Sequence, residues 1–194
     1  ENVREMAREA AEGIGITLQG VNVSYEEGKP VLRDCELSVK PGETVALMGR
    51  SGSGKTTLLR LILGIVHSSS GTVVMYTRSG GRTEPLGAAT RELIAYVPQG
   101  NTVFSGTILE NLVMVAPEAS EEEAEEALKT ACAWDFVKEL PDGIHSVVGE
   151  KGNGLSEGQA QRISIARAVL KKAPVILFDE ATSALDEETG RQVL

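Results

Sequence analysis

The sequence is poor in the residues that build disulfide frameworks and zinc sites. Its 194 residues include two cysteines, Cys35 and Cys132, which are far apart in the sequence and show no metal-ligand spacing. This usage favours a reduced, cytosolic setting over a secreted, disulfide-bonded domain. The first residues also lack the pattern of a signal peptide.

Long apolar runs and an excess of basic residues are missing as well. The most apolar segment, residues 58–66, contains Arg60 and is far shorter than the roughly 20 residues that a membrane-spanning helix needs. There are 19 Lys and Arg against 28 Asp and Glu, a net charge of −9. Because nucleic acids and anionic membranes are bound by basic patches, we expect no nucleic-acid partner. The acidic stretches 120–127 and 186–190 are interpreted as solvated helix faces.

What remains is an ordinary globular composition, 41% hydrophobic and 24% charged, with enough residues for one domain or one domain with a lobe. Residues 1–13 are charged and helix-prone, which is typical of a linker or of the end of a preceding element. The sequence starts without methionine and stops at Leu194 in a helical pattern. We therefore expect it to be a piece of a longer protein.

The order of patterns predicts an α/β fold. Short alternating runs typical of strands fill residues 16–47, with a turn at Pro41-Gly42, and two further strands are predicted at 71–76 and 93–98. Residues 107–172 are mostly helical in pattern. At 174–180 the sequence PVILFDE is apolar until its two acids, which predicts a parallel strand buried on both faces.

Residues 49–56, GRSGSGKT, match the Walker A pattern between a predicted strand at 44–48 and a predicted helix at 56–64. Glycines let successive N–H groups face a phosphate, and the helix start adds a positive dipole end. Lys55 is expected to reach the β- and γ-phosphates, and Thr56 to ligate Mg²⁺. A merely structural turn is the alternative, which the flanking strand and helix disfavour. The predicted nucleotide-binding residues are Gly49, Arg50, Ser51, Gly52, Ser53, Gly54, Lys55, Thr56 and Thr57.

Two acids end the apolar strand at 174–180. Asp179 is placed to hold Mg²⁺ through water, and Glu180, projecting to the other side of an extended chain, is placed to polarise an attacking water as general base. Alone, such a pair could simply end a strand in a turn. Together with the phosphate loop it becomes a strong indication of phosphoryl transfer.

The remaining motifs narrow the class. In order, YVPQ (96–99), LSEGQ (155–159), VILFDE (175–180) and SALD (183–186) resemble the nucleotide-binding domain of an ABC transporter ATPase, from Ile16 to Leu194. The resemblance implies a P-loop NTPase (RecA-like) core with an antiparallel β-subdomain and a helical subdomain. It implies the core at 16–99 and 172–194, the helical subdomain at 100–171, and a linker from a membrane domain at 1–15.

The same resemblance assigns roles to single residues. Gln99 becomes the Q-loop glutamine, which touches Mg²⁺ and water and reports the nucleotide state; a plain loop amide is the alternative. Tyr25 becomes the aromatic that stacks on adenine, unless it only packs. Asp186 becomes the D-loop acid, unless it only caps the next helix.

The signature LSEGQ has a local explanation too. Ser156 and Gln159 form the pattern of a capping box at a helix start, which is itself an anion site, so Ser156 and the Gly158 backbone can contact a γ-phosphate from another subunit. Glu157 departs from the family's glycine, and its carboxylate would repel a triphosphate unless the side chain turns outward at the first helical position, where its charge would favour the helix dipole. Because Ser156 and Gly158 remain, we expect binding to survive. The family's switch histidine would lie beyond Leu194, so we expect weak hydrolysis from this piece alone.

Two stretches, 96–112 and 143–159, are similar to exporter-type domains, which are usually fused behind a transmembrane domain. The resemblance thus implies ATP hydrolysis that drives export, by a head-to-tail dimer, expected to be a homodimer, at the cytoplasmic face of the cell membrane. A soluble ABC-type ATPase and an ATP-clamped domain with little turnover are the alternatives. A GTPase is disfavoured because no Asn-Lys-x-Asp motif occurs.

Overall fold

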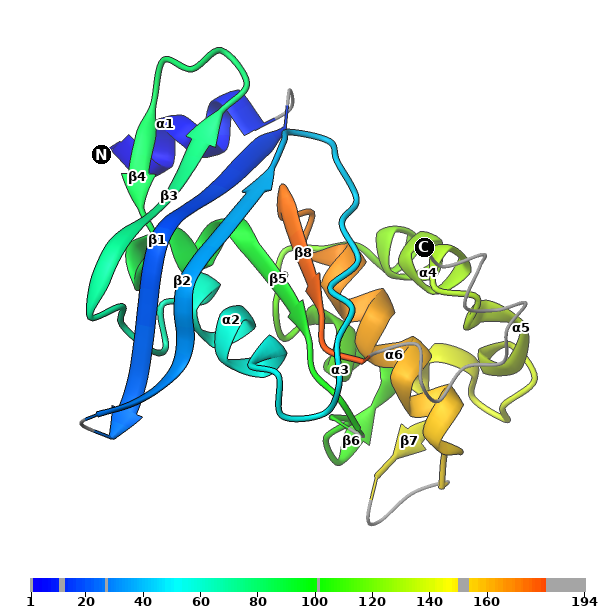
Figure 1. The fold of residues 1–194 in the computed structure, drawn as a ribbon. Helices are drawn as coiled ribbons and strands as arrows, with labels where there is room; N and C mark the ends of the chain where they lie inside the picture. Colours follow the sequence, from blue (N-terminus) through cyan, green and yellow to red (C-terminus); the bar gives the residue numbers. More distant parts are fainter. Residues whose placement is uncertain (1, 11–12, 27, 101, 150–153, 181–194) are drawn as a thin grey trace. The chain divides into compact units, whose positions relative to one another are not determined.

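The computed structural model describes residues 2–10, 13–26, 28–100, 102–149 and 154–180 (Figure 1). The chain divides into two compact units, Glu1–Ile94 and Ala95–Leu194, here called the N-terminal unit and the C-terminal unit. Among the described helices, none has both the length and the apolar character needed to cross a membrane.

The N-terminal unit is built on an antiparallel sheet with the strand order β2-β1-β3-β4. The first two alternating runs and the strand predicted at 71–76 are present as β1 (Ile14–Glu26), β2 (Lys29–Val39) and β3 (Ser70–Thr77), and the sheet adds β4 (Thr83–Pro85), which was not predicted. In β1 the buried side chains change from even to odd positions, from Leu18 to Val21, where the pairing register shifts. Gly20, with φ of 59°, lies at this bulge and lets the apolar residues stay on the core side.

Helical segments also accompany this sheet, namely α1 (Asn2–Glu9), α2 (Lys55–Ile62) and the short 3-10 helix η2 (Ala89–Leu93). α1 lies against β3 and η2 (Figure 1). Its Met6 is fully buried, and Arg82 donates to Glu9 at 2.9 Å and to Glu5 at 2.5 Å. This charged segment is therefore a helix docked on the sheet by buried apolar side chains together with ion pairs and hydrogen bonds.

The strand predicted at 44–48 is not formed. The Pro41-Gly42 turn is present, but residues 43–50 have no regular secondary structure, and Val45 and Met48 are 38% and 91% exposed. A segment with strand propensity forms a strand where a neighbouring edge accepts its hydrogen bonds. Across the described ranges no strand pairs with these residues.

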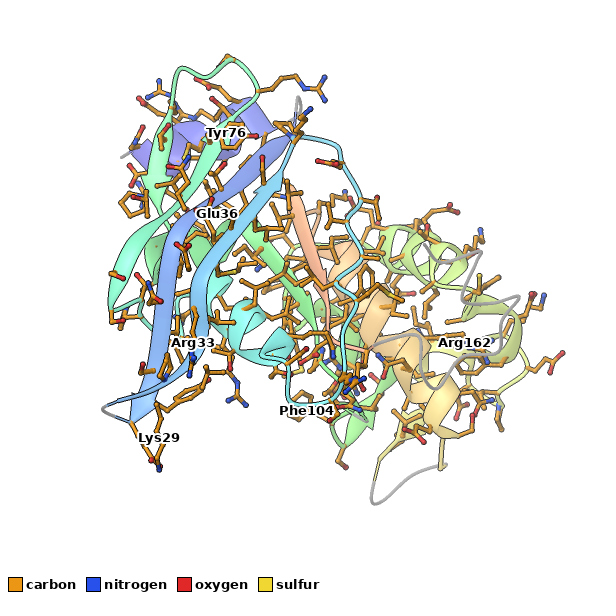
Figure 2. All side chains as sticks on the ribbon, in the orientation of Figure 1. Lys29, Arg33, Glu36, Tyr76, Phe104 and Arg162 are labelled. Atoms are coloured by element: carbon orange, nitrogen blue, oxygen red, sulfur yellow. The ribbon has the colours of Figure 1, made fainter. Side chains whose placement is uncertain are left out.

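The C-terminal unit is mainly helical. Its elements are β5 (Ile94–Val97, which begins one residue before the unit), β6 (Gly106–Thr107), α3 (Ile108–Val113), α4 (Glu121–Thr130), α5 (Trp134–Val137), η3 (Gly143–His145), β7 (Val147–Val148), α6 (Glu157–Leu170) and β8 (Val175–Phe178). α6 packs against α3 and α4, and Leu112, Leu128 and Ile163 are fully buried there. Arg162, labelled on α6 in Figure 2, covers the Phe136 ring at 5.1 Å. The predicted helical region is confirmed, with a small β6–β7 pair added.

The acidic helical stretch is divided into α4 and α5. Cys132, with φ of 53°, interrupts it, and the Ala133 N–H donates to the Leu128 carbonyl at 2.8 Å. The Cys132 N–H donates to Lys129 at 3.0 Å, so the carbonyls at the end of α4 are satisfied by the usual left-handed closing turn. α5 therefore starts in a new direction.

β5 and β8 form a two-stranded sheet and run in the same direction. The Asp179 N–H, just after β8, donates to the carbonyl of Val97, the last residue of β5, at 3.0 Å. Two carboxyl ends that meet in this way belong to parallel strands. The prediction that β8 is buried on both faces is wrong, since Ile176 is 39% exposed. Within the described residues β8 has one strand partner, so one of its edges lacks the neighbour that a central strand would have.

Candidate nucleotide-binding site

The turn from the phosphate loop into α2 has a backbone conformation that favours glycine. Gly54 is the N-cap of α2 and has φ of 91°, a left-handed conformation that costs other residues about 1–2 kcal/mol. A Cβ placed on Gly54 would lie 2.8 Å from Leu32 Cδ2 of β2. Both the turn into the helix and its close approach to β2 therefore depend on the absence of a side chain at this position.

Lys55 binds its own loop. Its Nζ donates to the Gly49 carbonyl at 2.7 Å and to the Arg50 carbonyl at 3.0 Å, and the Ser53 N–H donates to Arg50 at 3.2 Å. Gly54 supplies no side chain to cap α2, so an anion is a fitting cap for this helix start. Loop residues 49–53 are exposed, as is Thr56 in the first turn of α2, whereas Thr57 is buried.

Tyr25 lies beside this helix start. Its hydroxyl is 3.3 Å from the Thr57 hydroxyl, while the residue is 53% exposed. The hydrogen bond with Thr57 lowers the pKa of Tyr25, and Arg60 lowers it further through a hydrogen bond and its charge. The structure thus places the predicted adenine-stacking aromatic next to the phosphate loop, with much of its surface accessible.

The two acids lie in the C-terminal unit, at the carboxyl ends of β5 and β8. The Tyr96 hydroxyl donates to Asp179 Oδ2 at 3.1 Å, and the Gln99 side-chain amide donates to Glu180 Oε2 at 2.9 Å. Glu180 has φ of 51°, a conformation uncommon for a residue with a side chain. Tyr96 within β5 therefore contacts Asp179, and Gln99, two residues after β5, contacts Glu180.

The signature helix begins with the predicted capping box. The Ser156 hydroxyl accepts from the Gln159 N–H at 3.2 Å, and the Gln159 side chain accepts from the Ser156 N–H at 2.9 Å. A serine hydroxyl that accepts one bond still has its own hydrogen to donate. Glu157 is the first helical residue and is exposed, and Gly158 follows within the first turn.

Asp186 and Tyr96 complete the comparison of predicted and observed site residues. Asp186 lies outside the described residues. The contact of Tyr96 with Asp179 was not predicted, although Tyr96 belongs to the YVPQ motif that drew attention to Gln99. The sequence signal that could have found it is the pairing of two parallel strands whose motifs both end at the same edge.

The oxygen ligands that Mg²⁺ prefers are available on Thr56 and Asp179. Thr56 offers an exposed hydroxyl at the helix start, and Asp179 a carboxylate at a strand end, the donor types expected for a metal bound largely through phosphates and water. No cluster of three or more His, Cys, Asp or Glu side chains occurs in the described part of the chain. Thr56 in the N-terminal unit and Asp179 in the C-terminal unit therefore each offer an oxygen ligand of a type that suits Mg²⁺.

Comparison with known protein families identifies the family of this chain. The profile of the ABC transporter family matches residues 32–183, which is most of the chain and includes the phosphate loop, the signature and both acids. The chain belongs to the ABC transporter family. The predicted P-loop core with a β-subdomain and a helical subdomain is confirmed by a bacterial Atm1-family ABC exporter solved with ATP bound, at a TM-score of 0.83 and 34% identity. That match covers 93% of this chain and 31% of the exporter chain.

The curated relatives of this ABC transporter domain are much longer than this chain. An ATP-dependent lipid A-core flippase of Methylobacillus flagellatus is 42% identical over 186 residues, which cover 94% of this chain and 31% of the flippase. A putative multidrug export ATP-binding/permease protein of Staphylococcus aureus is 43% identical over 176 residues, 90% of this chain and 30% of that protein. The chain thus spans about a third of the length of these relatives.

Proposed function

We propose that this chain is the ATP-binding and ATP-hydrolysing domain of an ABC exporter. The observation that carries the proposal is the phosphate loop, in which a left-handed Gly54 opens α2 without a side-chain cap and Lys55 follows at once. Such a helix start accepts a phosphate as its cap. The relatives, a flippase and a drug export protein, favour the exporter over a soluble ABC-type ATPase or an ATP clamp.

The residues divide the work of binding. Tyr25 stacks on the adenine, and the N–H groups of residues 49–57 surround the phosphates. Lys55 exchanges its two carbonyl partners for the β- and γ-phosphate oxygens, which are stronger acceptors because they are charged. Thr56, Gln99 and Asp179 would hold Mg²⁺, which when bound neutralises charge on the phosphates.

Glu180 is the general base in this proposal. Its carboxylate accepts the proton of the attacking water, and Gln99, which donates to the same carboxylate at 2.9 Å, orients it. Little covalent chemistry is asked of the protein, since phosphoryl transfer is promoted mainly by positioning and charge stabilisation. Loss of the base should therefore slow hydrolysis while ATP stays bound.

The signature completes the site from a second copy. Ser156, Gly158, Gln159 and, outside the described residues, Asp186 would face the ATP held by residues 49–57 of the partner domain. Two such domains would close head to tail over two ATP and reopen after hydrolysis. The partner is expected to be an identical chain, joined to a transmembrane domain, so that the domain works at the cytoplasmic face of the cell membrane.

One experiment with two variants tests the proposal in the intact protein. Lys55→Ala should weaken ATP binding by roughly 10–100-fold, since it removes a charged hydrogen-bond donor, and Glu180→Gln should bind ATP normally but accumulate an ATP-bound dimer. Binding is measured by titration with a fluorescent ATP analogue and dimerisation by size-exclusion chromatography with light scattering. Lys40→Ala, an exposed lysine outside the loop, is the matched control.

Unchanged ATP affinity in Lys55→Ala would show that residues 49–56 do not bind the phosphates. Hydrolysis at the parental rate in Glu180→Gln would show that Glu180 is not the general base. The ATP-binding part of the proposal would still stand.

A further inference from the structure

Tyr96 of β5 contacts the carboxylate that is proposed to hold Mg²⁺. Its hydroxyl donates to Asp179 Oδ2 at 3.1 Å, and one residue further along β5 the Val97 carbonyl accepts from the Asp179 N–H at 3.0 Å. Asp179 is thus held by its main chain and by its side chain, both times from β5. We infer that Tyr96 is a positioning residue for Mg²⁺, which acts by fixing the Asp179 carboxylate; the inference rests on the proposed function.

The burial of β5 explains its other residues but not this hydroxyl. Ala95 and Val97 are almost fully buried, whereas Tyr96 between them is 36% exposed, since successive side chains of a strand point to opposite faces. Phenylalanine would provide the same ring for packing at this position. What tyrosine adds is a hydrogen-bond donor, and the structure aims that donor at Asp179.

A donor at Oδ2 suits a carboxylate that binds metal through water. Ionised Asp is an acceptor with about four lone-pair sites, so the bond from Tyr96 still permits contacts with metal-bound water. The bond restricts rotation of the carboxylate, and partners of this outer kind are known to tune metal affinity. Gln99, two residues after β5, likewise donates to Glu180 at 2.9 Å, so β5 and the segment after it supply one donor to each acid.

The test is Tyr96→Phe in the intact protein, with metal and nucleotide contributions separated. The affinity of a non-hydrolysable ATP analogue is measured with Mn²⁺ and with EDTA, and their ratio gives the gain due to the metal. We expect Tyr96→Phe to lower this ratio about three- to tenfold, below the roughly 10–100-fold typical of partners of direct ligands, because Asp179 acts through water. The affinity in EDTA should stay unchanged.

Tyr76→Phe is the matched control. Tyr76, labelled in Figure 2, is a tyrosine of β3 in the N-terminal unit whose hydroxyl donates to the Val39 carbonyl at 3.4 Å. Loss of that hydroxyl should leave the metal ratio at the parental value. An equal loss of affinity in Mn²⁺ and in EDTA for Tyr96→Phe would indicate a structural role and overturn the inference.

Asp179→Asn separates this inference from the proposed function. If Asp179→Asn lowers the metal ratio and Tyr96→Phe does not, the positioning role is wrong and the proposed function stands. If neither lowers it, Asp179 does not serve Mg²⁺, and both the inference and that part of the proposed function fail. When both lower it, the double variant should be no worse than Asp179→Asn alone, because Tyr96 acts through Asp179.

Discussion

The starts of α2 and α6 are built in opposite ways. In the proposed dimer, α2 of one copy and α6 of the other contact the same phosphate. α2 begins after Gly54, in a left-handed conformation and without a side-chain cap. α6 begins after Ser156, whose capping box with Gln159 satisfies two N–H groups within the helix itself. α2 is therefore shaped to take an anion as its cap, whereas α6 keeps its own cap and has a hydroxyl hydrogen to offer.

The contrast also shows that a capping box is not by itself evidence of function. α3 and α4 start with the same box, Thr107 with Glu110 and Ser120 with Glu123. The box at α6 differs in ending with Gln159, a neutral amide, where the other two end with glutamate. A carboxylate at that position would repel a phosphate, so the choice of glutamine suits an approaching nucleotide.

The largest effect is expected from Gly54→Ala. The substitution forces a side chain into φ of 91° and to within 2.8 Å of Leu32 Cδ2, so the free energy of unfolding should fall by about 2 kcal/mol. ATP affinity should fall more than tenfold, because the loop can no longer turn into α2 as it does. Chemical denaturation and ATP titration measure the two effects.

Gly80→Ala is the matched control for Gly54→Ala. Gly80 also has a positive φ, 67°, but a Cβ there meets nothing within 4 Å. Stability should fall by about 1 kcal/mol and ATP affinity should not change. Equal ATP affinities in Gly54→Ala and the parental protein would contradict the role of this helix start.

An intermediate effect is expected from Ser156→Ala. Loss of the cap should lower the free energy of unfolding by about 1 kcal/mol, and ATP-driven dimerisation should be lost while binding to the monomer is kept. Light scattering with and without ATP measures the dimer. Ser120→Ala removes the equivalent cap of α4 and should cost the same stability without affecting the dimer. Weaker binding to the monomer in Ser156→Ala would mean that the signature acts on ATP within its own domain.

The smallest effect is expected from Glu157→Gln, which removes the charge by which this signature departs from the family. Because an anion at a helix start is favourable, stability should fall by about 0.3–1 kcal/mol. Because the carboxylate also repels a triphosphate, the ATP-bound dimer should tighten about two- to threefold, more at low salt. A dimer constant that does not change at any ionic strength would show that Glu157 points away from the nucleotide.

Features set by neighbouring residues were predictable from the sequence. The start of α2 and the capping box of α6 each depend on residues within about four positions, and the phosphate loop on residues up to six positions apart; the structure has all three. The strand predicted at 44–48 did not form, and the local residues could not reveal this, because a strand also needs an edge to pair with. The prediction that β8 is buried on both faces failed for the same reason, since the composition of a strand does not reveal how many neighbouring strands it has.

The contacts among the site residues were the least accessible. Tyr96 and Asp179 are 83 positions apart, and their hydrogen bond depends on the register of β5 with β8. A shift of one residue would turn Tyr96 to the other face of the sheet. Tyr25 and Thr57 come together through the fold of the N-terminal unit in a similar manner. The motifs therefore indicated which residues belong to the site, whereas the contacts between those residues could be seen only in the tertiary structure.

The docked helix α1 has a mechanical consequence. Arg82 forms ion pairs with Glu5 and Glu9, which are one helical turn apart on α1, and Met6 of the same helix is fully buried. Asn2 itself also forms hydrogen bonds with Glu84 of β4 and with Arg82, so a pull on Asn2 is expected to load these side-chain contacts as well as the backbone. Because ion pairs between partly exposed side chains are weak, we expect those of Arg82 to break before the buried contact of Met6.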